Sequence, residues 1–296
     1  MSTEPTVPIA ELELFCNGLD HAEGICVTAG GTIYVGGEAG QIYRVENDGT
    51  PTEVHSTDGF LLGLACDAHG AIYAVDVTAR CVWRVGLEAR TQERFFEGLP
   101  DRPARQPNWG AFDADGNYYL SDSGDWGARN GLIWVRRAGG AVEVFTEESC
   151  NFPNGMAVSA DSRTLWVAES YPSALVRYAI GEDGTAGPRE HLLDLGLAVP
   201  DGVALCEDGS VLLSCYRPDT VFRWTPDGDL ETYATDPRGT AIAAPTNMVF
   251  TGPGRNELVM PNLGRWHLTR IRSTLVGVPL HYPTRAQIDA VAGPAA

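Results

Sequence analysis

The chain has few basic residues. Only 21 Lys and Arg residues stand against 39 Asp and Glu residues in a length of 296, which gives a formal net charge of −18 at pH 7. A field of this sign repels the phosphates of nucleic acids and the anionic headgroups of a membrane surface. The charge therefore argues against nucleic acid and membrane partners and favours a small-molecule partner. It leaves open whether the protein is a monomer or a small homo-oligomer.

Long apolar stretches and a cysteine framework are also missing. No run of eighteen apolar residues occurs, and the first eight residues contain neither the basic nor the apolar region of a secretory signal. The seven cysteines are odd in number, widely spaced and without a C-x-x-C pair, which argues against a disulfide framework or a thiolate zinc site. We expect a cytoplasmic protein with free thiols.

Several common catalytic signatures are missing as well. The sequence contains no G-x-S-x-G, H-E-x-x-H, P-loop or G-x-G-x-x-G motif. Each of these motifs carries a specific chemistry, so their absence weakens the serine hydrolase, zinc protease, nucleotide-binding and dinucleotide-binding interpretations.

One repeated unit organises the sequence. It contains a short apolar strand, a turn, a second strand, a loop, a third strand, another turn and a fourth strand. The turn and second strand of the six copies read AGGTIYVGG (29–37), AHGAIYAVD (68–76), ADGNYYLSD (114–122), ADSRTLWVAES (160–170), EDGSVLLSC (207–215) and PGRNELVMPN (253–262). Strict alternation without a sustained 3.6-residue period indicates strands and excludes helical repeats.

The spacing of the copies predicts the fold. The residues just before the six first strands are Glu23, Leu62, Asn108, Asn154, Asp201 and Asn247, at steps of 39, 46, 46, 47 and 46 residues. Four strands repeated six times at this period are typical of a six-bladed β-propeller with four antiparallel strands per blade.

The ends of the chain complete this prediction. A fourth strand follows each of the first five copies, but the sixth copy lacks one, whereas the segment 11–16 near the N-terminus has the same alternation. We expect this segment to complete the last blade and close the ring, which removes exposed sheet edges. The prediction is a single domain over 1–296, with a wrapping tail at about 274–296.

The six residues before the first strands are expected to form a ring at one mouth of the central channel. Five of them carry side-chain oxygens, and two are carboxylates, Glu23 and Asp201. An all-oxygen set suits a hard cation such as calcium, and the absence of His and Cys argues against zinc or copper. Asn154-Gly155 and Asp201-Gly202 are also ordinary turn dipeptides. However, the turns that the repeat needs lie a few residues later.

The stretches HAEGICV (21–27), NFPNGMAVSADSRTLWVAES (151–170), VPDGVALCEDGSVLLSCY (199–216) and PNLGRWHLTRI (261–271) resemble the superfamily of senescence marker protein, gluconolactonase and luciferin-regenerating enzyme. The resemblance covers about residues 11 to 282. It implies a six-bladed propeller and a metal-dependent lactonase or esterase.

Residue by residue, the resemblance places the family's metal ligands on Glu23, Asn154 and Asp201. It also places on Asn108 an asparagine that binds metal in some members and substrate in others. Two positions depart from the usual pattern: Ile25 stands where a proline is common, and Trp109 where a small or acidic residue is common. The sequence Glu23-Gly24-Ile25, without the proline, is also similar to that of strictosidine-synthase-like propellers.

The predicted activity is hydrolysis of a lactone or ester with one divalent metal ion as Lewis acid. Calcium ranks first, with magnesium, manganese and zinc as alternatives. Asp201 is the expected catalytic residue, as general base or as nucleophile. Residues expected to contact substrate are His21, Trp109, Trp126, Tyr171, Tyr216, Asn247 and His267. The alternatives are a propeller whose metal is structural and whose open face binds a ligand, and a metal-free, strictosidine-synthase-like enzyme.

Overall fold

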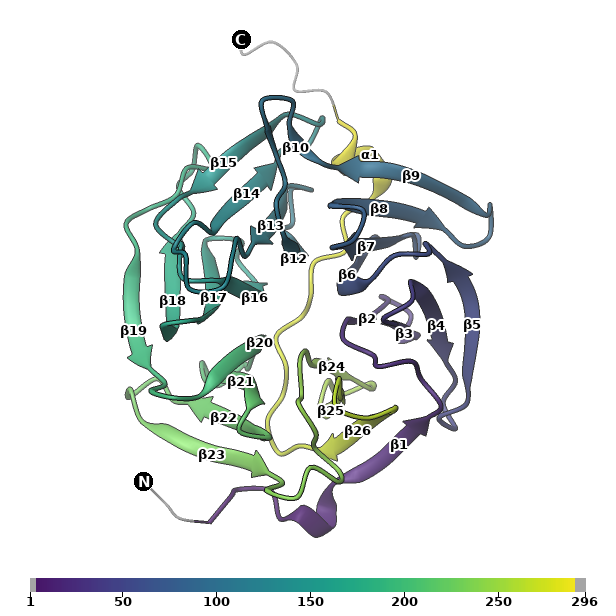
Figure 1. The fold of residues 1–296 in the computed structure, drawn as a ribbon, viewed down its shortest axis with the longest axis vertical. Coiled ribbons are helices and arrows are strands. Elements are labelled where there is room, and N and C mark those ends of the chain that lie inside the picture. The colour runs from purple at the N-terminus through teal and green to yellow at the C-terminus, as the bar shows by residue number, and fades with distance from the viewer. Residues whose placement is uncertain (1–3, 291–296) are drawn as a thin grey trace.

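The computed structural model describes residues 4–290 and shows six four-stranded antiparallel sheets around a central axis (Figure 1). The predicted six-bladed β-propeller is confirmed. Helix is confined to the 3₁₀ turn η1 (Ile9–Glu11) and the four-residue helix α1 (Arg285–Ile288) within the described range. No helix in residues 4–290 has the length and apolar character that a membrane span needs.

Five blades are built from consecutive strands, ordered from the axis outward. Blade 1 contains β2 (Ile25–Val27), β3 (Ile33–Gly36), β4 (Gln41–Val45) and β5 (Pro51–Ser56). Blade 2 contains β6 (Leu61–Cys66), β7 (Ile72–Asp76), β8 (Cys81–Gly86) and β9 (Thr91–Phe96). Blade 3 contains β12 (Pro107–Phe112), β13 (Tyr118–Asp122), β14 (Leu132–Arg136) and β15 (Val142–Thr146). The short hairpin β10 (Gly98–Leu99) and β11 (Arg102–Pro103) lies between blades 2 and 3 in sequence.

The remaining blades close the ring. Blade 4 contains β16 (Pro153–Val158), β17 (Thr164–Ser170), β18 (Ser173–Ala179) and β19 (Glu190–Asp194). Blade 5 contains β20 (Val199–Leu205), β21 (Val211–Arg217), β22 (Thr220–Trp224) and β23 (Leu230–Thr235). Blade 6 contains β24 (Val249–Thr251), β25 (Glu257–Pro261), β26 (His267–Arg272) and, as its outer strand, β1 (Glu13–Asn17).

The N-terminal strand therefore closes the propeller, as predicted. In the antiparallel pair of β1 and β26, Glu13 lies opposite Arg270. The Arg270 guanidinium donates to both carboxylate oxygens of Glu13, at 2.8 and 2.9 Å. This two-pronged ion pair fixes the register in which the first and last strands meet.

The hydrophobic core lies between neighbouring blades. Between blades 2 and 3, Tyr73 packs edge to face on Phe112 with ring centroids 4.8 Å apart, and Phe95 packs in the same way on Tyr118 at 5.3 Å. Since each sheet is covered on both faces by its neighbours, apolar side chains are buried on both faces of a strand. This accounts for the apolar second and third strands of the repeat.

The inner strands touch through glycines that follow the predicted ring residues. A Cβ atom at Gly24 or Gly155 would overlap the carbonyl oxygen of the next blade, Leu62 or Asp201. A Cβ atom at Gly202 would lie 2.6 Å from the carbonyl oxygen of Thr246. These glycines are required because another backbone approaches closely. Gly155 and Gly202 lie within strands β16 and β20, and Gly24 directly precedes β2, so they are not the turn glycines of the repeat.

The C-terminal segment crosses the central channel instead of following the rim. Figure 1 shows it as a yellow trace that runs from the end of β26 across the axis to α1. Gly277 forms a bridge with Cys206 of blade 5, and the Tyr282 hydroxyl donates to the carbonyl of Val27 in blade 1 at 2.8 Å. The His281 ring contacts the carbonyl of Ser159 in blade 4 at 2.9 Å.

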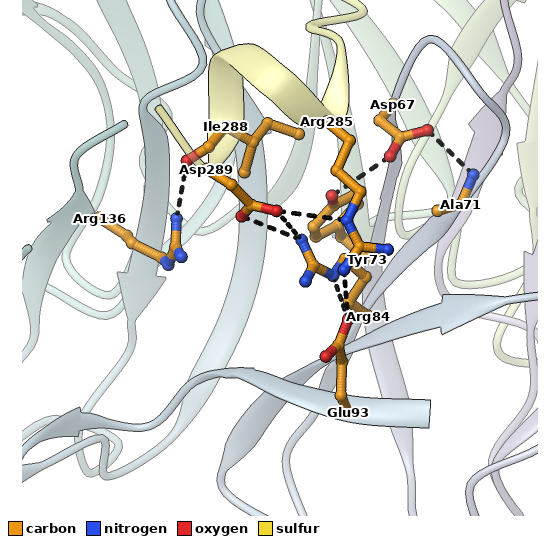
Figure 2. Close-up of polar contacts among 9 residues, drawn as sticks. All are labelled: Asp67, Ala71, Tyr73, Arg84, Glu93, Arg136, Arg285, Ile288 and Asp289. Atoms are coloured by element: carbon orange, nitrogen blue, oxygen red, sulfur yellow. Dashed lines mark hydrogen bonds and ion pairs between the residues drawn. The ribbon is translucent and has the colours of Figure 1, made fainter. Parts of the chain in front are cut away.

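Helix α1 anchors this segment on blades 2 and 3 (Figure 2). Asp289 receives two hydrogen bonds from Arg84, each 3.1 Å long, and Arg84 also donates to Glu93. Arg136 of blade 3 donates to the carbonyl of Ile288, whose side chain is fully buried in the core between blades 2 and 3. The segment therefore joins blades on opposite sides of the axis.

The close approach of the inner strands makes Gly155 intolerant of a side chain. We expect Gly155→Ala to lower the free energy of unfolding by about 1–3 kcal/mol, because the new methyl group meets backbone that cannot rotate away. Gly30→Ala is the matched control, because its nearest neighbouring atom is 3.8 Å away. Denaturant unfolding of both variants tests this, and equal stabilities would contradict it.

The anchoring of α1 predicts an unusually large effect for a residue near the end of the chain. Ile288→Ala removes a side chain with no exposed surface and should cost about 2–4 kcal/mol of unfolding free energy. Leu280→Ala, in the same segment but half-exposed, should cost less than about 0.5 kcal/mol. Thermal and denaturant unfolding give the comparison. A negligible cost at Ile288 would show that the segment is peripheral to stability.

Candidate functional site

The phased residues predicted to form a ring lie at the start of the inner strands, where the sheet ladder is interrupted. In each of blades 3, 4 and 5, two consecutive residues of the inner strand have no partner in the second strand, and the first of the two is Asn108, Asn154 or Asp201. Glu23 and Asn247 lie two residues before β2 and β24. Interruptions of this kind change the direction of side chains and leave backbone groups without a partner in the ladder, and they are frequent beside functional sites.

Contacts between neighbours show that these residues form one ring. The Asn247 amide nitrogen lies 3.4 Å from the carbonyl oxygen of Glu23, and the hydroxyl of Thr246 donates to the same carbonyl at 2.9 Å. Gly155 is pressed against the backbone of Asp201. Leu62 occupies the sixth position with a buried apolar side chain, so the side-chain oxygens at this level come from the other five blades.

Two serines hold the asparagine amides in a fixed orientation. The amide nitrogen of Asn108 donates to Ser123 Oγ at 3.0 Å, and Ser123 donates its own proton to the carbonyl of Pro153. Asn154 donates to Ser170 Oγ at 3.3 Å, and Ser170 donates to the carbonyl of Pro200 in the same way. Because each serine has already used its only proton, it can only accept from the amide, which leaves the amide oxygen free.

The ring contains buried oxygens that have no partner. Among residues 4–290, no hydrogen-bond donor reaches the Oδ1 atoms of Asn108, Asn154, Asp201 and Asn247. The four side chains are at most 6% exposed. An unpaired buried oxygen is costly, and four of them at the same level of the channel indicate a site that an additional group satisfies.

The electrostatics of the two carboxylates indicates that this additional group carries a positive charge. Burial raises the pKa of Asp201 to about 7, against the lowering effect of the Asn154 amide. Burial, together with the charges of Asp201 and Glu38, raises the pKa of Glu23 well above its ordinary value. Two desolvated carboxylates and three amide oxygens fit a hard divalent cation, since the cation would neutralise the carboxylates and satisfy the amides.

A second polar cluster lies beside the ring on blade 1. His21 Nδ1 is 3.3 Å from an Asp20 carboxylate oxygen and 3.2 Å from Glu38 Oε2, and the Trp266 indole donates to His21 Nε2 at 3.2 Å. These contacts place the proton of a neutral His21 ring on Nδ1. The charge of Glu38 also acts on the buried Glu23 carboxylate, so this cluster, with the predicted substrate residue His21, lies near the ring.

Trp109 and His267 are placed in the protein interior. The Trp109 indole donates to the carbonyl of Met156 at 2.8 Å and packs between blades 3 and 4. His267 is buried in β26, and its Nε2 atom lies 3.0 Å from the carbonyl of Ala241. Both side chains have protein partners, in contrast to the unpaired oxygens of the ring.

A cavity of about 110 Å³ continues the channel on the other side of the ring. Inner strands of all six blades line it, and so do residues 278–282 of the C-terminal segment. The lining residues follow the ring residues in each inner strand, so the ring lies at one end of this cavity and the C-terminal segment at the other. Trp109 contributes to its wall.

The open mouth carries the other predicted substrate residues. Trp126 and Tyr171 lie in the loops after β13 and β17 and are 54% and 50% exposed. Tyr216 is partly exposed at the end of β21, with the Arg217 guanidinium 4.8 Å from its ring centroid. Within each blade the first and second strands are antiparallel, so the second strand ends at the edge of the sheet where the first strand begins. These residues and the ring therefore share one face of the propeller.

Sequence reasoning missed the serines at the ends of β13 and β17. Ser123 and Ser170 follow Asn108 and Asn154 by fifteen and sixteen residues, so their similar offset within the repeat was available as a signal. Ser121 and Ser214, further into the second strands, were also missed. Ser121 donates to the carbonyl of Asn154 and Ser214 to that of Thr246, which ties adjacent blades together.

Comparison with solved structures finds proteins of similar fold. A gluconolactonase from Xanthomonas campestris is 18% identical, with 89% of each chain covered and a TM-score of 0.75. A calcium-binding protein, regucalcin, from Agrobacterium tumefaciens is 17% identical, covering 95% of this chain and 98% of that one, with a TM-score of 0.77. A streptogramin B lyase is 14% identical, covering 89% and 97%, with a TM-score of 0.67. At these identities the likeness establishes the fold alone.

Comparison of the sequence is more specific. No curated protein sequence matches this chain. A family model described as the SMP-30/Gluconolactonase/LRE-like region matches residues 21–262, which contain all six ring positions. The resemblance seen in the sequence is confirmed, and the chain belongs to the SMP-30/gluconolactonase/LRE-like family.

Proposed function

We propose that the protein is a metal-dependent hydrolase of lactones or esters. The observation that carries this proposal is the set of four unpaired, buried oxygens in a ring that also holds two carboxylates of raised pKa. Membership of a family that includes gluconolactonases supports a small-molecule substrate with a lactone group. The structurally similar regucalcin is a calcium-binding protein, which supports calcium as the ion.

Each ring residue has a role in this proposal. Glu23, Asn154 and Asp201 would hold the cation, and Asn108 and Asn247 would either complete its coordination or bind the substrate. A bound divalent cation supplies positive charge beside the substrate carbonyl oxygen and stabilises the negative charge that develops there. The serine contacts of Asn108 and Asn154 keep their oxygens directed into the ring before anything binds.

Asp201 is the group that acts on the reacting atoms. As a general base, its carboxylate takes a proton from water while the water oxygen bonds to the carbonyl carbon. The acyl C–O bond then breaks, and the leaving oxygen receives the proton. As a nucleophile, the carboxylate itself bonds to the carbonyl carbon, and the acyl C–O bond breaks while the leaving oxygen takes a proton from water. The resulting hydroxide then attacks the carboxyl carbon of Asp201, which releases the acyl group as a carboxylate. In a single turnover in H₂¹⁸O, the first route puts ¹⁸O in the product, whereas the second puts it in Asp201.

Replacing Asp201 tests the function directly. We expect Asp201→Asn to lower kcat for lactone and aryl ester hydrolysis by about 10²- to 10⁴-fold, because an amide can neither accept the proton nor attack. Removing metal with a chelator should abolish wild-type activity, and added calcium should restore it. Asp227→Asn, an exposed aspartate, is the matched control. Full activity in Asp201→Asn, or in the chelated protein, would refute the proposal.

The raised carboxylate pKa values predict an opposite pH dependence for the metal-free and calcium-loaded proteins. The folded state binds protons at Asp201 up to about pH 7, whereas the unfolded chain releases them near pH 4, so the metal-free protein loses stability as the pH rises between these values. Calcium competes with those protons and binds only the folded state, so it should stabilise more at pH 8 than at pH 5.

Thermal unfolding at these two pH values, with chelator and with calcium, measures the effect. The calcium-induced rise in Tm should be several degrees larger at pH 8, and it should be reduced in Asp201→Asn. An equal rise at both pH values, or none, would show that the ring does not bind the ion through its carboxylates.

A further inference from the structure

The exposed aromatic side chains are concentrated on the face of the ring. The seven large apolar side chains with high exposure in residues 4–290 are Ile9, Leu14, Trp126, Tyr171, Leu197, Trp266 and Leu280. All three aromatic members follow a second strand, in the loops after β13, β17 and β25. Isolated exposed apolar residues are ordinary, but aromatic residues gathered around a mouth mark a binding surface.

Two of these residues form a stacked pair. The Trp126 and Tyr171 rings lie 5.2 Å apart between centroids with an interplanar angle of 24°, although they come from different blades. Phe152 supports the pair edge-on to Trp126, with centroids 4.9 Å apart. The pair remains half-exposed despite this packing, so it presents apolar area to the mouth.

The pair is attached directly to the ring. Phe152 precedes Asn154 by two residues, a span of at most about 7 Å. Tyr171 follows Ser170, the residue that holds the Asn154 amide, and its backbone N–H donates to the carbonyl of Asn151 at 3.2 Å. A substrate whose reacting group sits at the ring would therefore meet the aromatic pair on the side of Asn154.

The opposite side of the mouth has a different character. Blade 1 presents His21 with Asp20 and Glu38, joined by polar contacts. The exposed Trp266 of blade 6 lies beside this cluster and donates its indole N–H to His21, so the two sides differ in that only the Trp126 side offers a stacked aromatic pair. A polyhydroxylated lactone would place hydroxyl groups against the aromatic pair, where ring faces give them poor hydrogen-bonding partners. A lactone or ester with one apolar substituent fits this mouth better. Its polar reacting group would lie at the ring and toward the polar cluster of blade 1, and its apolar substituent would contact the aromatic pair.

We propose that Trp126 and Tyr171 bind an aromatic or bulky apolar side chain of the substrate and so select such lactones or esters over sugar lactones. This proposal rests on the hydrolase function of the ring. The pair would act by stacking and by apolar contact, and it would take no part in proton transfer. It is the specificity-determining surface of the mouth.

Binding of lactams separates this proposal from the hydrolase proposal, because lactams share the shape of lactones and resist hydrolysis. The probes are a six-membered lactam with a phenyl substituent and the unsubstituted lactam, titrated calorimetrically into the calcium-loaded protein. We expect wild type to bind the phenyl lactam at least about 10-fold more tightly. Trp126→Ala together with Tyr171→Ala should remove that preference, and Trp126→Phe should retain most of it.

Leu14→Ala is the matched control, because Leu14 is similarly exposed on β1 of blade 6, away from the pair. It should leave both affinities unchanged. Equal affinity of wild type for the two lactams, including no measurable binding of either, would overturn the proposal. So would a preference that survives in the double variant. Failure of the hydrolase proposal shows separately, as absence of turnover on any lactone or ester by a protein that still prefers the phenyl lactam.

Discussion

The centre of this molecule depends on how closely the backbones of neighbouring inner strands approach each other. Glycines at 24, 155 and 202 remove the side chains that would separate them. Serines of the second strands then span the contact, so that Ser121 and Ser214 reach carbonyl groups of the next blade. The diameter of the ring is therefore set by backbone contacts between blades, and these contacts place the two buried carboxylates of Glu23 and Asp201 in the same ring.

The features that could be predicted from the sequence are those that repeat. The phase of the six positions from Glu23 to Asn247 gives one residue per blade, which is enough to predict the propeller and to propose the ring. The closure by the N-terminal strand was predictable from the alternation in 11–16 and from the missing fourth strand of the last copy. The serines at the ends of β13 and β17 recur at a similar offset from Asn108 and Asn154, but a serine at the end of an apolar strand also fits the start of a loop, so the sequence alone does not assign it a role. The dipeptide Asn154-Gly155 has the composition of a turn, although its glycine serves a close contact.

The direction of individual side chains could not be predicted from the repeat either. Trp109 stands next to Asn108 in sequence, but the interrupted ladder turns its indole toward Met156 in the neighbouring blade. The route of the C-terminal segment was likewise not predictable. Its residues have no alternation, and their positions follow from scattered partners such as Val27, Ser159 and Arg84 in three different blades.

The closure of blade 6 has a consequence for how the chain assembles during synthesis. Blades 1 to 5 consist of consecutive segments, so each can form soon after its own residues leave the ribosome. Strand β1 is made first and pairs with β26, about 250 residues later, so it stays without a partner while five blades form. An unpaired strand invites pairing with other chains. The short length of β1 and the charge of Glu13 limit that hazard until Arg270 emerges to pair with it.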